Sequence, residues 1–165
     1  MLLLNNTFTN KINLKMKLIK NSISLFLLTI IISCGSVKST LKNVDNTAPK
    51  PEIKDGHYVI TTYSSDPKYG YNKDYPINLG FDNERFGERS AIHFFNALLG
   101  PKGEKITFLK IDNCCPFPTT RSTMGGGILE VYEISFEGKS NKALIYVNIY
   151  DKGKIECPKG FTLVK

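Results

Sequence analysis

The sequence predicts an α+β fold in which one helix packs on a mainly antiparallel sheet of four or five strands. Three apolar segments in the second half of the chain have the composition of strands, and one segment before them has a helical period. A polar loop, residues 137–142, joins the last two strand segments as a hairpin. We therefore expect a single α+β domain over residues 56–165.

Two short strands are expected at the start of this domain. Residues 57–63 are rich in β-branched and aromatic side chains, which are typical of strands. Residues 75–80 form a shorter candidate, in which Pro76 favours a sheet edge or the first position of a strand because proline lacks an N–H.

The helix is expected over residues 83–99. Asn83 or Asp82 can cap its start, and Gly100-Pro101 is a good stop signal. At 100° per residue one continuous face is apolar, and it carries Ala91, Ile92, Phe94, Phe95, Leu98 and Leu99. The opposite face carries Arg89, His93 and Asn96. One side of the helix should therefore pack on a flat apolar surface.

Three longer strands should supply that surface, at residues 105–111, 128–136 and 143–150. Alternation in the middle strand places five side chains on one face, namely Ile128, Glu130, Tyr132, Ile134 and Phe136. The loop over residues 137–142 is longer than the tightest hairpin turns.

The first 33 residues have the features of a secretory signal peptide. Four lysines precede an apolar run of ten residues, 23–32, and a spanning helix would need roughly 20. A start at Met16 would give a cleaner signal. Ile31-Ile32-Ser33-Cys34 resembles a bacterial lipobox, which predicts cleavage before Cys34 and lipidation of its sulfur and amine.

Residues 34–55 are expected to form a flexible tether, because they are polar and lack an apolar period. Such a length gives roughly 25 Å of reach. The whole chain carries a net charge of +7, but four of its 22 Lys and Arg residues lie in the signal. The remaining 18 face 15 acidic residues, so a net charge of +3 remains and no nucleic-acid partner is expected.

Three cysteines remain after Cys34, and the compartment permits disulfides. A bond between Cys157 and either Cys114 or Cys115 would close a loop of about 42 residues and is the preferred hypothesis. A bond between Cys114 and Cys115 is awkward, since adjacent Cα atoms lie about 3.8 Å apart and disulfides usually span about 4.4–6.8 Å. Reduced or intermolecular cysteines are the third alternative.

Motifs for catalysis are absent from the sequence, so we expect no catalytic residues, no cofactor and no metal. There is no C-x-x-C, G-x-S-x-G or H-E-x-x-H, and the two histidines have no ligand-like spacing from the cysteines. Met124-Gly-Gly-Gly127 lacks the Lys and Ser/Thr of a phosphate loop. Candidate ligand contacts are Tyr69, Tyr71 and Tyr75, which cluster before the helix, and Arg121 beside the cysteines.

The segments Tyr69-Gly-Tyr71, Asn96–Pro101, Cys114-Cys-Pro-Phe117, Leu129–Tyr132 and Tyr146–Asp151 resemble small lipoproteins of Bacteroidota-type bacteria. The resemblance covers about residues 57–161, and its motifs carry no known reaction. Relatives sometimes bear the name 2-dehydro-3-deoxyphosphooctonate aldolase. That activity is improbable here, because the enzyme is a (β/α)₈ barrel of typically about 250 residues.

Together these features predict a lipid-anchored protein of the cell envelope whose domain binds or supports an envelope protein or glycan. The alternative is an envelope enzyme with a reactive thiol at Cys114 or Cys115. The residue after Cys34 is not the Asp used for inner-membrane retention in some bacteria, which favours the outer membrane.

Overall fold

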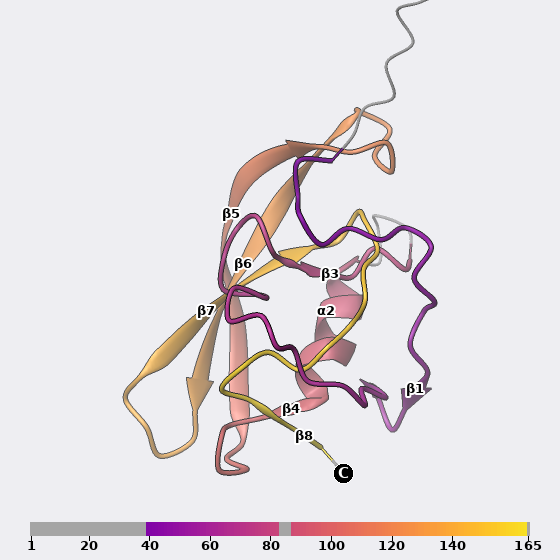
Figure 1. The fold of residues 1–165 in the computed structure, drawn as a ribbon. Coiled ribbons are helices and arrows are strands. Elements are labelled where there is room, and N and C mark those ends of the chain that lie inside the picture. The colour runs from indigo at the N-terminus through magenta and orange to yellow at the C-terminus, as the bar shows by residue number, and fades with distance from the viewer. Residues whose placement is uncertain (1–38, 83–86, 165) are drawn as a thin grey trace, which may run out of the picture. The chain divides into compact units, whose positions relative to one another are not determined.

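A four-stranded sheet with one helix against it forms the centre of the protein (Figure 1). The computed structural model describes residues 39–82 and 87–164. The helix is α2 (Gly87–Asn96), and the long strands are β5 (Ile106–Pro118), β6 (Gly126–Phe136) and β7 (Lys142–Asn148). Five strands have two residues each: β1 (Ile53–Lys54), β2 (His57–Tyr58), β3 (Ile77–Asn78), β4 (Leu98–Leu99) and β8 (Thr162–Leu163).

The sheet is mixed, with the strand order β3-β7-β6-β5. β5, β6 and β7 are antiparallel neighbours, whereas β3 pairs with β7 in parallel, Ile77 opposite Val147 and Asn78 opposite Asn148. The α+β class is confirmed, with one helix in the described residues. We expected a mainly antiparallel sheet of four or five strands; the sheet has four, and its pairing of β3 with β7 is parallel. Residues 57–63 add no strand to this sheet and contribute only β2, which pairs with β1 in a separate small sheet.

The helix packs its predicted apolar side on the sheet. Ala91, Phe94 and Phe95 are fully buried, and Phe95 stacks on Phe108 of β5 with ring centroids 4.8 Å apart. Ile92, which we expected on this face, is 41% exposed. The expected helix start lies outside the described residues. The helix ends at Asn96 rather than Leu99, because residues 98–99 extend into β4 and pair with β8.

Residues 42–54, which we name the N-terminal strap, make contacts with the domain before the expected boundary at residue 56. The amide of Lys42 donates to the carbonyl of Asp74 at 2.9 Å, and the amide of Asp45 donates to that of Lys152 at 2.8 Å. Ala48 is buried. The strap ends in β1, and a two-residue Asp55-Gly56 turn with positive φ at both residues leads to β2.

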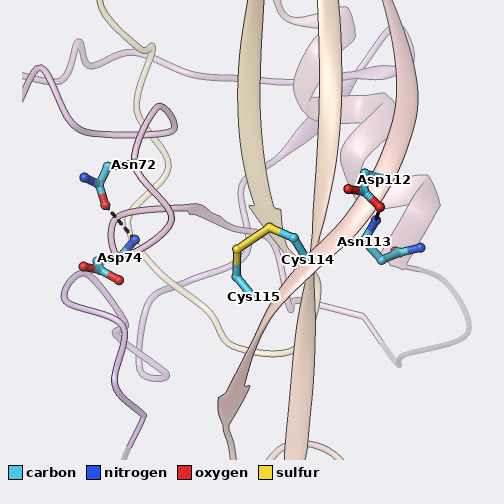
Figure 2. Close-up of a disulfide and its surroundings, with 6 residues drawn as sticks. All are labelled: Asn72, Asp74, Asp112, Asn113, Cys114 and Cys115. Carbon is cyan, nitrogen blue, oxygen red and sulfur yellow. Dashed lines mark hydrogen bonds between the residues drawn. A yellow bond between two sulfur atoms is a disulfide. The ribbon is translucent and has the colours of Figure 1, made fainter.

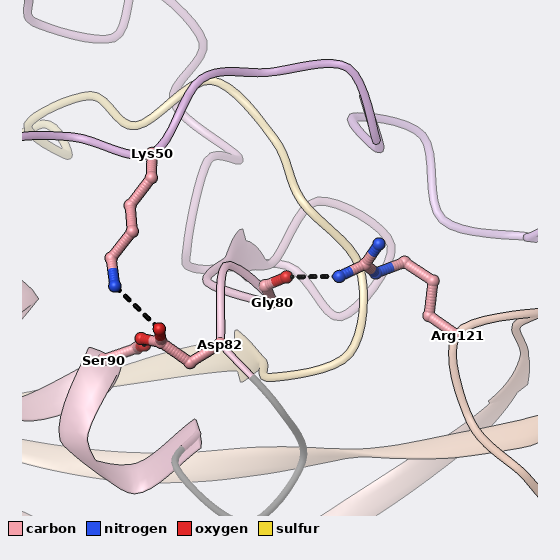
Figure 3. Close-up of polar contacts among 5 residues, drawn as sticks. All are labelled: Lys50, Gly80, Asp82, Ser90 and Arg121. Atoms are coloured by element: carbon pink, nitrogen blue, oxygen red, sulfur yellow. Dashed lines mark hydrogen bonds and ion pairs between the residues drawn. The ribbon is translucent and has the colours of Figure 1, made fainter.

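A salt bridge also fastens the strap close to the helix. Lys50 Nζ lies 2.7 Å from Asp82 Oδ1, and the hydroxyl of Ser90 on α2 donates to Asp82 Oδ2 at 2.9 Å (Figure 3). Asp82, which we expected as a helix cap, therefore joins the strap to the first half of the helix.

Candidate functional site

Cys114 and Cys115 lie in β5, the last strand of the sheet, where the pairing with β6 shifts register. Cys114 faces Leu129 and Pro116 faces Ile128, so Cys115 is the extra residue of a bulge. Its φ is 62°, in the left-handed region that side chains rarely adopt. The two Cα atoms are 3.7 Å apart and the sulfur atoms are turned toward each other (Figure 2). This bulge could accommodate a bond between neighbouring cysteines.

Cys157 lies apart from this pair, and the hypothetical link to it is not formed in the structure. Its side chain is fully buried, its thiol is free and lies 3.7 Å from the carbonyl oxygen of Pro158. Residue 157 bridges to Tyr63 in parallel rather than approaching β5. Burial raises the pKa of this thiol to about 12, so at neutral pH it is protonated and a poor nucleophile.

Tyr69 and Tyr71, two of the candidate ligand contacts, hold the C-terminal segment in place. The Tyr69 hydroxyl donates to the carbonyl of Lys154 and accepts from the amide of Glu156, each at 3.1 Å. The Tyr71 hydroxyl donates to the carbonyl of Lys159. Burial raises the pKa of both phenols, that of Tyr71 to about 12. These hydroxyls are occupied by backbone groups of the domain itself.

Tyr75 and Arg121 are also engaged within the domain. The Lys68 ammonium lies 5.5 Å from the centre of the Tyr75 ring. Arg121, on the loop between β5 and β6, donates from Nε to the carbonyl of Tyr150 at 2.7 Å. Its Nη2 donates to the carbonyl of Gly80 at 2.8 Å (Figure 3). The guanidinium thus fastens the loop to two other segments.

A buried polar network that the sequence analysis missed lies where the parallel strands β3 and β7 end. Asn148 donates from Nδ2 to Asn78 Oδ1 at 2.9 Å and to Asp151 Oδ2 at 3.3 Å. Thr119 donates to Asp151 Oδ1 at 2.8 Å, and Asn46 of the strap donates to the same oxygen at 3.2 Å. All but Asn46 are nearly inaccessible. The available signal was an asparagine near the end of each of two apolar segments, at positions 78 and 148.

A second buried polar side chain lies on the face of the sheet that packs against the helix. Glu130 is 6% exposed and accepts from Lys110 Nζ at 2.6 Å and from the Tyr132 hydroxyl at 2.9 Å. Burial and the Glu130 charge raise the pKa of Tyr132. The carboxylate therefore has a cation and a hydroxyl as partners, which is the arrangement that a buried charge requires.

The two histidines do not form a metal site. His93 contacts the carbonyl of Gly56 through Nδ1 at 2.8 Å, and His57 lies in β2. Within residues 39–82 and 87–164, no group of three or more His, Cys, Asp or Glu side chains could hold a metal ion. Across the same ranges, no helix is long and apolar enough to cross a membrane. Cys34 and the signal segment lie outside the described residues.

Comparisons with known proteins identified no relative. No family model matches the chain, and neither the curated proteins nor the solved structures contain a match.

Proposed function

We propose that this protein is a lipid-anchored protein of the bacterial cell envelope, carrying its lipid on Cys34, and that its domain binds a partner protein. The signal-like segment and the lipobox-like sequence before Cys34 support the anchor. The single observation behind the binding role is the set of aliphatic side chains left exposed on the open face of the sheet.

This open face is the side of the sheet opposite α2. Phe108, Ile134 and Ile145 lie toward the helix core, so alternation places their neighbours Leu109, Glu133 and Leu144 on the other side. These three residues form one row across β5, β6 and β7. Leu109 is 65% exposed and Leu144 46%. The two leucines flank Glu133, whose carboxylate is already paired with Lys142 Nζ at 2.6 Å. Exposed aliphatic side chains on either side of a neutralised charge favour a protein partner over a sugar, which needs polar contacts.

The edge of β5 is less suited to binding a further strand. The bulge at Cys115 interrupts its pairing pattern, and Pro116 and Pro118 have no N–H to donate. A partner is therefore expected to contact side chains of the open face rather than to extend the sheet.

Capture from envelope extracts tests this proposal. Tagged full-length protein is cross-linked in cells, and partners are compared between the native chain and a Leu109→Glu/Leu144→Glu double variant. A matched control is Ile92→Glu, because Ile92 has similar exposure at 41% but lies on the helix. We expect the double variant alone to lose the partner. An unchanged set of captured proteins, or capture of glycan only, would contradict the proposed binding face.

The anchor requires a separate experiment. Labelled palmitate should enter the native chain and not a Cys34→Ser variant. Equal labelling of both proteins would eliminate Cys34 as the lipid site.

A second candidate function is thiol–disulfide exchange at the cysteine bulge, and the half-exposed position of Cys114 and Cys115 favours it. Oxidation would join the two sulfurs, with two protons and two electrons passing to a disulfide-bearing oxidant that leaves as two thiols. A partner thiolate could then attack one sulfur and release the other as the leaving thiolate.

Thiol counting distinguishes this candidate. If the pair is bonded, unreduced denatured protein should take up alkylating reagent at Cys157 but not at Cys114 or Cys115, whereas reduced protein should take it up at all three of these residues. Exchange chemistry further requires that a small dithiol reduces the pair in the native protein and that Cys115→Ser abolishes mixed disulfides. Three modified cysteines without prior reduction would eliminate the bond.

A further inference from the structure

We infer that Cys114 and Cys115, in their reduced form, are a binding site for one trivalent arsenic centre, which they hold through both sulfur atoms. This inference is independent of the proposed anchor and of the proposed binding face. Its basis is the bulge in β5, where the sulfur atoms of two neighbouring residues converge (Figure 2).

The bulge changes the direction in which these two side chains point. In a regular strand, successive side chains point to opposite faces, so adjacent sulfur atoms would lie on the two sides of the sheet. Cys115 is instead the extra residue of the bulge, and at its φ of 62° its side chain is directed toward that of Cys114. Backbone conformations of this kind cluster at ligand sites, where the surrounding structure maintains them. The convergence of the two sulfur atoms is therefore a property of the folded strand.

The pair is accessible, and it has no third sulfur beside it. Cys114 and Cys115 are half-exposed, and β5 is the last strand of the sheet. Cys157 is fully buried and belongs to another segment. In the parts of the chain that the structure describes, no three His, Cys, Asp or Glu side chains gather as they would for a metal ion. A zinc site, which takes three or four such ligands, is therefore not formed at this pair.

The short spacing of the pair selects among the centres that two sulfur atoms can satisfy. The two Cα atoms are 3.7 Å apart, so the sulfur atoms approach a ligand side by side. Trivalent arsenic is pyramidal, and two of its bonds to sulfur lie nearly at a right angle, which suits such a close pair. Copper(I), which soft thiolates also bind, prefers two sulfur ligands on opposite sides of the ion. Neighbouring residues reach that arrangement less well, so we assign the site to arsenic.

Binding is an exchange of ligands without electron transfer. The two thiols give their protons to two hydroxides bound to arsenic, and two molecules of water leave. Two S–H bonds and two As–O bonds break, while two S–As bonds and two O–H bonds form. The pair must be reduced for this step, so a bond between the two sulfurs would block the site until a thiol or phosphine reductant opens it.

Uptake of phenylarsine oxide by the phosphine-reduced protein tests the site. The full chain carries Cys34→Ser, so that the three cysteines of the domain are its only thiols. Mass spectrometry under native conditions should show one phenylarsenic group per chain and the loss of two hydrogen atoms. The matched control Cys157→Ser should give the same result. Cys114→Ser should bind about 100-fold more weakly or less, because the second sulfur acts at a high effective concentration.

Two further arms test whether the fold contributes to the site. Cys115→Gly removes the second thiol while glycine adopts the same positive φ, so this variant should keep its circular dichroism spectrum and lose the same affinity as Cys114→Ser. The folded protein should bind at least about tenfold more tightly than the same chain in urea, because the bulge already holds both sulfur atoms together. Equal affinity in urea, or binding that survives the loss of either thiol of the pair, would overturn the inference.

Discussion

Replacing Asn148 with alanine should lower the free energy of unfolding by about 3–4 kcal/mol, a large part of the usual stability of a domain. Asn148 is fully buried, and its amide group makes four hydrogen bonds. Nδ2 donates to Asn78 and Asp151, while Oδ1 accepts from the amides of Tyr150 and Asp151. Alanine would leave all four partner groups without this contact.

The magnitude follows from those four groups. A buried polar group that loses its partner costs about 1–3 kcal/mol, and the lower value applies here because water can enter the space that the side chain vacates. With a urea dependence of about 1.5–2 kcal/mol per molar, the expected loss moves the unfolding midpoint down by about 2 M.

Urea unfolding followed by circular dichroism measures this shift. Asn96→Ala is the matched control, because Asn96 is exposed and makes one long contact of 3.4 Å, so it should change stability by no more than about 0.5 kcal/mol. A midpoint within about 0.5 M of the native protein for Asn148→Ala would mean that the network adds little to stability.

Four other substitutions test separate features. Gly80→Ala should lower the free energy of unfolding by more than about 3 kcal/mol or prevent folding, because the added carbon would collide with the Tyr150 backbone. Gly103→Ala should lower it by about 1–2 kcal/mol, because Gly103 has a positive φ but open space around it. Hydrogen bonds from Lys139 and from the Lys102 amide lower the Glu104 pKa from 4.5 to about 2, so the stability of the native protein should fall as the pH drops through this interval. In Glu104→Gln the midpoint of urea unfolding should depend less on pH over the same interval. Burial raises the Cys157 pKa from 9.0 to about 12, so the unfolded chain loses this proton first and stability should decline above about pH 9. Cys157→Ala should weaken that alkaline decline; an unchanged slope would contradict the role of the thiol.

The parts of the fold that the sequence predicted are the long periodic ones. Strands β5, β6 and β7 and the apolar side of α2 each repeat a pattern over several residues, and burial on one face of an element produces such a pattern. A two-residue strand has no period, so nothing in Ile77–Asn78 indicated the parallel pairing with β7. Pro76 suggested an edge strand or a strand start, and β3 is indeed the outermost strand opposite β5.

The site residues were harder to predict, because side-chain chemistry does not say which way a loop residue turns. Tyr69 and Tyr71 looked suited to stacking on a ligand, yet their hydroxyls bond to carbonyls about 85 residues further along the chain. Polar composition likewise predicted a free tether up to residue 55. Asn46 instead bonds to Asp151, a contact that only the tertiary fold creates.

Several segments of the first half of this domain bond to its last fifteen residues. Asp45 bonds to residue 152, the Tyr69 hydroxyl to residues 154 and 156, Tyr63 bridges to residue 157, and β4 pairs with β8. A chain that leaves a ribosome or a translocation channel N-terminus first can form the β5–β6–β7 hairpins early, because their partners are close in sequence. The strap lacks its bond to Lys152 until the C-terminal segment has also emerged, whereas its contacts with Asp74 and Asp82 need only earlier residues. Folding of this protein should therefore finish only after synthesis or export is complete, and a chain truncated near residue 150 should lack the bonds of Asp45 and Asn46 to residues 152 and 151.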